Sequence, residues 1–203
     1  MKKTLLLITA LASILFFSFK PHGTMTYRPD LEKSTVGWHA KKVTGEHMGN
    51  VKIKSGSILV DHHAPSRGEF VIDMTSITCT DLKDAGYNAK LVGHLKSDDF
   101  FSVAKYPEAT LKIKSFTPVA GSRAGEANYT IKGDLTIKGI TKEISFPAVM
   151  TVTDRMITAK ADIKIDRSEF DVRYGSGKFF DNLGDKLIYD DFTLSVDLTA
   201  VPN

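Results

Sequence analysis

One short stretch of the chain, GHLKSDDFF at residues 93–101, concentrates side chains that could carry out chemistry. His94, Asp98 and Asp99 offer an imidazole and two carboxylates, which can coordinate a divalent metal ion or act as an acid–base set. His47, between the glycines of GEHMG, could join them only if the fold brought it close. The histidine spacing gives little support, since the chain has no HxH or HExxH pair. We therefore expect no metal site and no cofactor.

Nucleophilic catalysis has less support still. Cys79 is the only cysteine, and at the end of a strand-like run it is more typical of a small buried side chain than of a reactive thiol. The carboxylate pairs at residues 98–99 and 190–191 are chain neighbours, which diverge on an extended backbone. The chain has neither a GxSxG nucleophile motif nor a glycine-rich phosphate loop. We expect a protein that is not an enzyme.

The net charge and the N-terminal residues indicate where the protein is located and which partners it can bind. The chain of 203 residues has 27 basic and 24 acidic side chains, but three of the lysines lie within residues 1–23, so the remainder is balanced. A balanced body argues against binding to nucleic acid. Two lysines precede an apolar run at residues 5–19, which is typical of a secretory signal and short for a membrane span. We expect residues 1–23 to be a signal peptide of unassigned cleavage site, and the protein to be periplasmic or secreted, in the cell envelope.

The elements that must position these side chains are mostly strands. From Tyr27 onward apolar and polar residues alternate with period two, most clearly in ITAKADIKI at 157–165 and FTLSVDL at 192–198. The other alternating runs are residues 36–43, 55–61, 68–74, 110–116, 129–135 and 142–149. Turn residues separate them at Lys138-Gly139 and at 153–155. The series predicts an antiparallel sandwich or barrel.

One segment has a helical period instead. Between Asp81 and Leu95 apolar residues recur at spacings of three and four, with Asp81 as the expected N-cap and Asp84 in the first turn. Two glycines weaken this helix by about 1 kcal/mol each relative to alanine. A short helix between strands can act as a lid or plug for a barrel end, or simply connect strands over a core edge.

The interior of such a barrel can be open or filled. A closed barrel of about eight strands encloses enough room for its own side chains or for one ligand. Ala40, Gly133, Ala159 and Ala161 are small residues at inward positions and would leave volume. The large aromatic side chains could equally fill it, and the pattern allows both outcomes.

Three longer motifs add a resemblance: GHLKSDDFFSVAKYPEATLKI, GDLTIKGITKEISFPA and IDRSEFDVRYGSGKFFDNLGDK. In this order they resemble the YceI-like family, known as the polyisoprenoid-binding or lipid-binding YceI-like domain. The resemblance runs from about Tyr27 to Leu198. It implies a mainly β fold, an extended antiparallel lipocalin-like β-barrel of about eight strands with one short helix near a barrel end. It also implies an elongated apolar cavity in an exported protein, with residues 24–203 as the lipid-binding domain.

The resemblance can be followed residue by residue. The family's His-Leu-(Lys/Arg)-Ser-x-Asp-Phe element falls on residues 94–100, its Gly-Asp-Leu-Thr element on 133–142, and an Asp-Arg pair of one branch on 166–167. Two positions depart from it: some members have histidine where this chain has Lys42, and close relatives often have tryptophan where it has Phe170. Both differences bear on cavity width and head-group contacts.

Candidate site residues follow from the inward pattern and the resemblance. The candidates for an apolar cavity are Trp38, Phe70, Leu91, Phe100, Phe101, Ile113, Ile131, Phe146, Ile163, Phe170 and Phe192. A polar head group would lie at the mouth, where His94, Lys96 and Arg167 are the candidates. Arg167 could instead pair with Asp166 or another carboxylate and brace the turn after its strand.

The expected function is non-catalytic binding or carriage of a long-chain isoprenoid (polyprenyl) or similar acyl lipid, with transient contact to a membrane surface. One alternative is an envelope stress or structural protein that acts through protein partners. Another is an enzyme on an envelope lipid that uses His94 with Asp98 or Asp99. The sequence names neither the lipid nor the oligomeric state.

Overall fold

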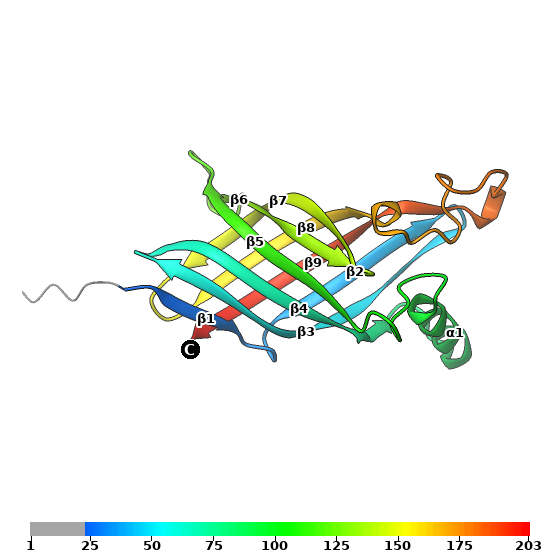
Figure 1. Ribbon diagram of the computed structural model, residues 1–203, viewed down its shortest axis with the longest axis horizontal. Coiled ribbons are helices and arrows are strands. Elements are labelled where there is room, and N and C mark those ends of the chain that lie inside the picture. Colours follow the sequence, from blue (N-terminus) through cyan, green and yellow to red (C-terminus); the bar gives the residue numbers. More distant parts are fainter. Residues whose placement is uncertain (1–22) are drawn as a thin grey trace, which may run out of the picture.

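The computed structural model describes residues 23–203, so the predicted signal peptide lies outside the described residues apart from Gly23. Within these described residues, nine strands and one α-helix make up the fold (Figure 1). The strands are β1 (Met25–Pro29), β2 (Thr35–Lys42), β3 (Gly45–Asp61), β4 (Ala64–Cys79), β5 (Glu108–Pro118), β6 (Tyr129–Ile137), β7 (Ile140–Val152), β8 (Ile157–Asp166) and β9 (Ile188–Pro202). The helices are α1 (Ala85–Lys96) and the 3-10 turns η1 (Arg167–Phe170) and η2 (Gly184–Lys186).

Strands β2 to β9 form a closed antiparallel barrel of eight strands, which confirms the predicted fold class. Each strand pairs with the next, and β9 returns to pair with β2. Strand β2 has 8 residues, whereas its neighbours β3 and β9 have 17 and 15. The short β1 continues the sheet beyond β2, because it pairs with both β3 and β9. The edges that two long strands would otherwise expose are thereby covered.

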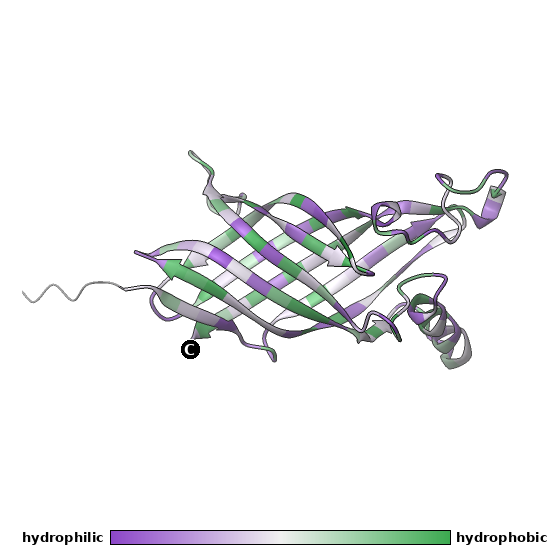
Figure 2. Cartoon of the chain, in the orientation of Figure 1, coloured by the Kyte–Doolittle hydropathy of each residue, from purple (hydrophilic) through white to green (hydrophobic). Residues whose placement is uncertain are grey.

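The alternating pattern of the sequence places one face of each strand in the barrel core. In β8 the side chains of Ile157, Ala159, Ile163 and Ile165 are buried, while the lysines between them are exposed. Figure 2 shows the corresponding hydrophobic and hydrophilic bands along the strands. Among the described residues, no helix has the length and hydrophobicity needed to cross a membrane.

Tight hairpins join several strands. His62 and His63 between β3 and β4, and Lys138 and Gly139 between β6 and β7, all have positive φ. Two consecutive left-handed residues are the signature of the type I′ turn, whose twist matches that of paired strands. The first turn is therefore shorter than the turn-rich stretch HHAPSRG predicted, and β4 begins already at Ala64.

Helix α1 begins later than the sequence predicted, and its N-cap is Asp84 rather than Asp81. The Asp84 side chain accepts a hydrogen bond from Tyr87 N at 2.9 Å. The Asp81 carboxylate is instead engaged by β3, where Met48 N donates to it at 2.9 Å and His47 lies 2.8 Å away. A carboxylate held by a strand cannot also cap the helix.

The two ends of the barrel differ. At one end, where β1 and the C-terminus lie, Tyr27, Ile157 and Ala200 are buried, and the Tyr27 hydroxyl donates to Thr153 O at 2.8 Å. We call this the closed end. The opposite end contains α1 and the segment of residues 167–187, which connects β8 to β9 (Figure 1, green and orange). We call this the open end.

Candidate ligand-binding cavity

The barrel interior is open rather than filled. It contains a cavity of about 210 Å³ lined almost entirely by hydrocarbon side chains from every strand of the barrel. Lining residues near the closed end, such as Phe146, Met150 and Leu198, are buried, whereas Tyr189 at the open end is 49% exposed. The cavity therefore has its mouth at the open end, next to α1 and the 167–187 segment.

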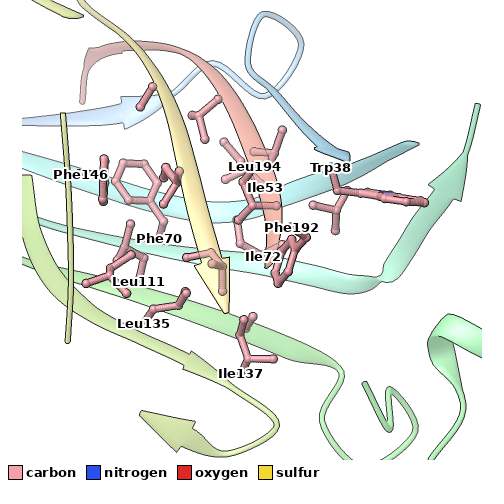
Figure 3. Close-up of a pocket in the computed structure, with 18 of the residues that line it drawn as sticks. Trp38, Ile53, Phe70, Ile72, Leu111, Leu135, Ile137, Phe146, Phe192 and Leu194 are labelled. Carbon is pink, nitrogen blue, oxygen red and sulfur yellow. The ribbon is translucent and has the colours of Figure 1, made fainter. Parts of the chain in front are cut away.

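Most of the predicted apolar candidates line this cavity. They are Trp38, Phe70, Phe100, Phe101, Ile113, Ile131, Phe146, Ile163 and Phe192. Figure 3 shows Phe70, Phe146 and Phe192 around the interior, with the Trp38 ring to the right of them. The Trp38 indole donates a hydrogen bond to Thr78 O at 3.0 Å, which fixes the ring where β3 and β4 pair.

Two candidates, Leu91 and Phe170, are not among the residues that line the cavity. In α1 it is Leu95, one turn further along the helix than Leu91, that reaches the cavity. Phe170 is 1% exposed in η1 and packs in the core beside the cavity. Periodicity identifies the apolar face of a helix, but not which of its turns meets the barrel.

The small inward residues have two distinct roles. Ala40, Ala159 and Ala161 line the cavity and leave it room, as predicted. Gly133 does not line it: a Cβ there would lie 2.6 Å from Lys112 O, so this glycine allows β5 and β6 to approach closely.

His94 lies where α1 meets the 167–187 segment over the mouth. Its imidazole contacts the rings of Phe100 and Tyr174 edge to face, with centroids 4.8 and 4.5 Å apart. Its Nε2 is 3.2 Å from Asp99 Oδ2. The predicted pairing of His94 with an aspartate of residues 98–99 is thus present, but it lies outside the cavity on a partly exposed surface.

Asp98 has a different partner. Its carboxylate accepts a hydrogen bond from Lys105 Nζ at 2.9 Å, and this lysine holds the pKa of Asp98 below its usual range. Asp98 and Asp99 therefore have different partners, Lys105 and His94, and do not form one acid–base set. Lys96 also points away from the cavity, since its Nζ donates to Thr75 O of β4 at 2.7 Å.

Arg167 lines the cavity but is 4% exposed, and its guanidinium is heavily engaged. Nε donates to Tyr189 O at 3.2 Å, Nη1 to the carbonyls of Val172 and Tyr174 at 2.9 Å, and Nη2 to Ile188 O at 3.0 Å. Nη2 also lies 3.3 Å from Asp190 Oδ1.

These contacts match the bracing role that was the alternative for Arg167, with Asp190 as the carboxylate. Burial lowers the pKa of the guanidinium, and the nearby carboxylates of Asp190 and Asp166 oppose that shift. Asp166 itself pairs with Lys178 and caps η1 by accepting from Ser168 N at 2.9 Å. Arg167 thus ties the 167–187 segment to the start of β9.

Sequence reasoning missed many lining residues. Among them are Ile53, Ile72, Leu111, Leu135, Ile137 and Leu194, all labelled in Figure 3. Each is at an inward position of an alternating run, so extending the alternation along every strand would have found them.

The fold and the cavity define a class of protein: a closed antiparallel barrel of lipocalin-like form around an apolar cavity. Residues 27–200 match the family model of the YceI-like domain, and the chain belongs to this family. The predicted resemblance is confirmed.

Relatives and solved structures agree with this assignment. The chain is 30% identical over 155 residues to Protein YceI of Escherichia coli, covering 73% of this chain and 72% of that one. It is 30% identical over 147 residues to a UPF0312 protein of Photorhabdus laumondii, covering 71% and 70%.

Two solved structures have the same fold. Burkholderia cenocepacia BcnA superposes with a TM-score of 0.65 at 26% identity, over 85% of this chain and 99% of that one. A polyisoprenoid binding domain from Saccharophagus degradans, implicated in plant cell wall breakdown, superposes with a TM-score of 0.62 at 14% identity, over 88% and 99%.

Proposed function

We propose that this protein binds and carries, without catalysis, a long-chain isoprenoid or a similar amphiphilic lipid. The observation that carries the proposal is the open apolar cavity that runs from buried residues near the closed end to an exposed mouth. An apolar chain gains about 25 cal/mol for each Å² that it removes from water, and hydrocarbon walls offer it no competing polar contact. The polyisoprenoid binding reported for the Saccharophagus degradans domain supports the same ligand class.

The tail would lie along the barrel, and the head group would emerge at the mouth. Arg167 holds the mouth in shape through its carbonyl contacts, so we place it in the frame of the site. His94 and Tyr189 are the better candidates for head-group contact, because each carries a polar group at the open end and is partly exposed.

Transient contact with a membrane surface is part of the proposal. Phe179 and Phe180, in the 167–187 segment, are 40% and 50% exposed. Aromatic side chains are favoured at the boundary between lipid and water. A mouth that touches a bilayer through them would let a lipid enter without crossing water. The signal-like pattern of residues 1–23 supports an envelope location, which fractionation of cells that express the full chain would test.

The central test is a binding measurement with a cavity-filling variant. Protein purified from its own envelope is extracted and any bound lipid is identified by mass spectrometry. Affinity for a fluorescent long-chain prenyl alcohol is then compared between the wild type, Ala161→Trp, which fills the cavity, and Thr151→Trp, which places the same side chain at an exposed position. We expect at least a tenfold loss in Ala161→Trp only. No affinity in the wild type, or equal affinity in both variants, would contradict lipid binding.

A second candidate is an enzyme on an envelope lipid, favoured by the contact between His94 and Asp99. If His94→Ala abolished turnover of a bound lipid while its affinity persisted, this candidate would replace simple carriage.

A further inference from the structure

Three potential metal ligands meet beside the barrel, outside the lipid cavity. His47 comes from the start of β3, Cys79 is the last residue of β4, and Asp81 follows two residues later. The imidazole nitrogen, the thiol sulfur and a carboxylate oxygen all lie within 4.8 Å of one another. Asp81 Oδ2 is 2.8 Å from His47 Nδ1, and Asp81 Oδ1 is 3.1 Å from Cys79 Sγ.

The surrounding backbone holds the three residues in place. Strands β3 and β4 pair up to this point, with Cys79 opposite Gly49, and Thr80 N donates to Met48 O at 2.9 Å. From α1, the Asn88 side chain donates to the carbonyls of Cys79 and Leu82, each at 2.9 Å. Groups held by strands and by a second layer of hydrogen bonds need little rearrangement to bind a ligand.

Burial leaves one side of the cluster accessible. Cys79 is 8% exposed, whereas the side chains of His47 and Asp81 are 27% and 24% exposed. Three ligands on a partly buried base with one open side suit a tetrahedral ion whose fourth ligand is water. A nitrogen, a thiolate and a carboxylate form a donor set for zinc, while a thiolate disfavours magnesium and calcium.

The hydrogen bonds of the cluster show how the site is held without metal. The Cys79 thiol donates a hydrogen bond to Asp81 Oδ1, with a distance of 3.1 Å between the sulfur and the oxygen. A metal ion takes the place of that proton when it binds, as it does in other thiolate sites. Without metal, the Asp81 carboxylate is the common partner of the Cys79 thiol and the His47 imidazole, and it holds both beside it.

We propose that His47, Cys79 and Asp81 form a binding site for a divalent transition-metal ion of the zinc class. The ion joins β3 and β4 at the open end, next to the start of α1. None of the three residues lines the lipid cavity, so this inference does not depend on the proposed function. The sequence spacing concealed the site because its ligands are 32 and 2 positions apart, and only the pairing of β3 with β4 brings His47 to the other two.

The test uses the full chain with Co²⁺ as a spectroscopic probe and Zn²⁺ in calorimetric titration. We expect one Co²⁺ per chain, with the thiolate-to-cobalt charge-transfer absorption and the intense visible bands of a tetrahedral site, all displaced by Zn²⁺. His47→Gln and Cys79→Ser should each weaken Zn²⁺ affinity at least tenfold, and Cys79→Ser should also abolish the charge-transfer band. The matched control is His39→Gln, which removes another imidazole paired with a carboxylate on a strand.

A second measurement keeps the proposal testable if a variant of the buried Cys79 fails to fold. In the wild type, saturating Zn²⁺ should slow alkylation of Cys79, the only cysteine, at least tenfold. No charge-transfer band, no protection of the thiol, or equal loss of affinity in His39→Gln would overturn the proposal and leave the cluster as a hydrogen-bonded clamp.

Discussion

The closed and open ends of the barrel are stabilised in different ways. At the closed end, Ile157 and Ala200 are 0% exposed, and β1 seals the sheet by pairing with two strands. At the open end, α1 has no buried residue, and it meets the 167–187 segment through the rings of His94, Phe100 and Tyr174. The closed end is densely packed, whereas the elements at the open end meet through a few contacts between partly exposed side chains.

The two ends therefore contribute to different properties: one to the stability of the fold, the other to ligand access to the cavity. Dense packing at one end supplies free energy of unfolding, while weak contacts at the other leave the mouth free to admit a ligand. Arg167 is the exception, since it is a buried charge at the open end. The following predictions test how far this division holds, from the largest expected effect to the smallest.

Arg167→Met should have the largest effect on stability. It leaves the buried Oδ1 of Asp190 without its ion-pair partner and removes the donors of several carbonyls, at a cost of about 3–5 kcal/mol. Urea unfolding measures the change, and Arg173→Met is the control, because Arg173 is exposed and pairs with Asp171. Equal stability of the two variants would mean that the open end has no buried anchor.

Ile157→Ala should destabilise the protein by about 2–5 kcal/mol, because it creates a cavity in the packed closed end. Affinity for the prenyl probe should stay unchanged, since Ile157 does not line the lipid cavity. Ile188→Ala, at the partly exposed mouth, should cost less stability and alter binding more. The reverse order in urea unfolding would contradict the division between the ends.

Asp166→Asn should lower stability at neutral pH by about 1–2 kcal/mol. Burial alone would raise the pKa of Asp166, but hydrogen bonds from Lys178 and Ser168 outweigh it and the pKa is lowered. A carboxylate with a lowered folded-state pKa stabilises above its unfolded pKa of about 4, and this contribution is lost as pH falls through the folded pKa. The wild type and the variant should therefore converge in acid unfolding, and a constant difference down to low pH would argue against an ionised Asp166.

Tyr174→Ala should have the smallest effect on stability, about 1 kcal/mol or less, because the ring is 46% exposed. It removes contacts with His94 and Phe100 across the mouth, so association and dissociation of the prenyl probe should both become faster. Stopped-flow fluorescence measures the rates. Unchanged rates would show that these contacts do not limit entry to the cavity.

Much of the fold could be predicted because its signals are local. The run at residues 157–165 was identified by alternation alone, and the structure forms β8 over Ile157–Asp166. The start of α1 was misplaced because Asp81 and Asp84 are both acceptable caps by type. Only the contacts of Asp81 with β3 decide between them.

The candidate site could be predicted in part for the same reason. Inward aromatic residues such as Phe70 and Phe146 follow from alternation, and they line the cavity. Arg167 and Lys96 were grouped as head-group candidates because both are cationic. In the structure Arg167 donates to backbone carbonyls within the open end of the barrel, whereas Lys96 donates to the carbonyl of Thr75 in β4. No local sequence pattern distinguishes these two environments.

The sequence by itself determined the period of the strands, the turns at Lys138-Gly139 and at 153–155, and the family, because these depend on residues close together in the chain. Tertiary structure decided what depends on closure of the sheet. Closure left the interior open between its aromatic side chains, directed Arg167 to Asp190 rather than to its neighbour Asp166, and brought His47 beside Cys79 and Asp81. The physical reason is register: the partners of a side chain across a barrel are set by strand pairing over long separations, and residue spacing along the chain does not contain that information.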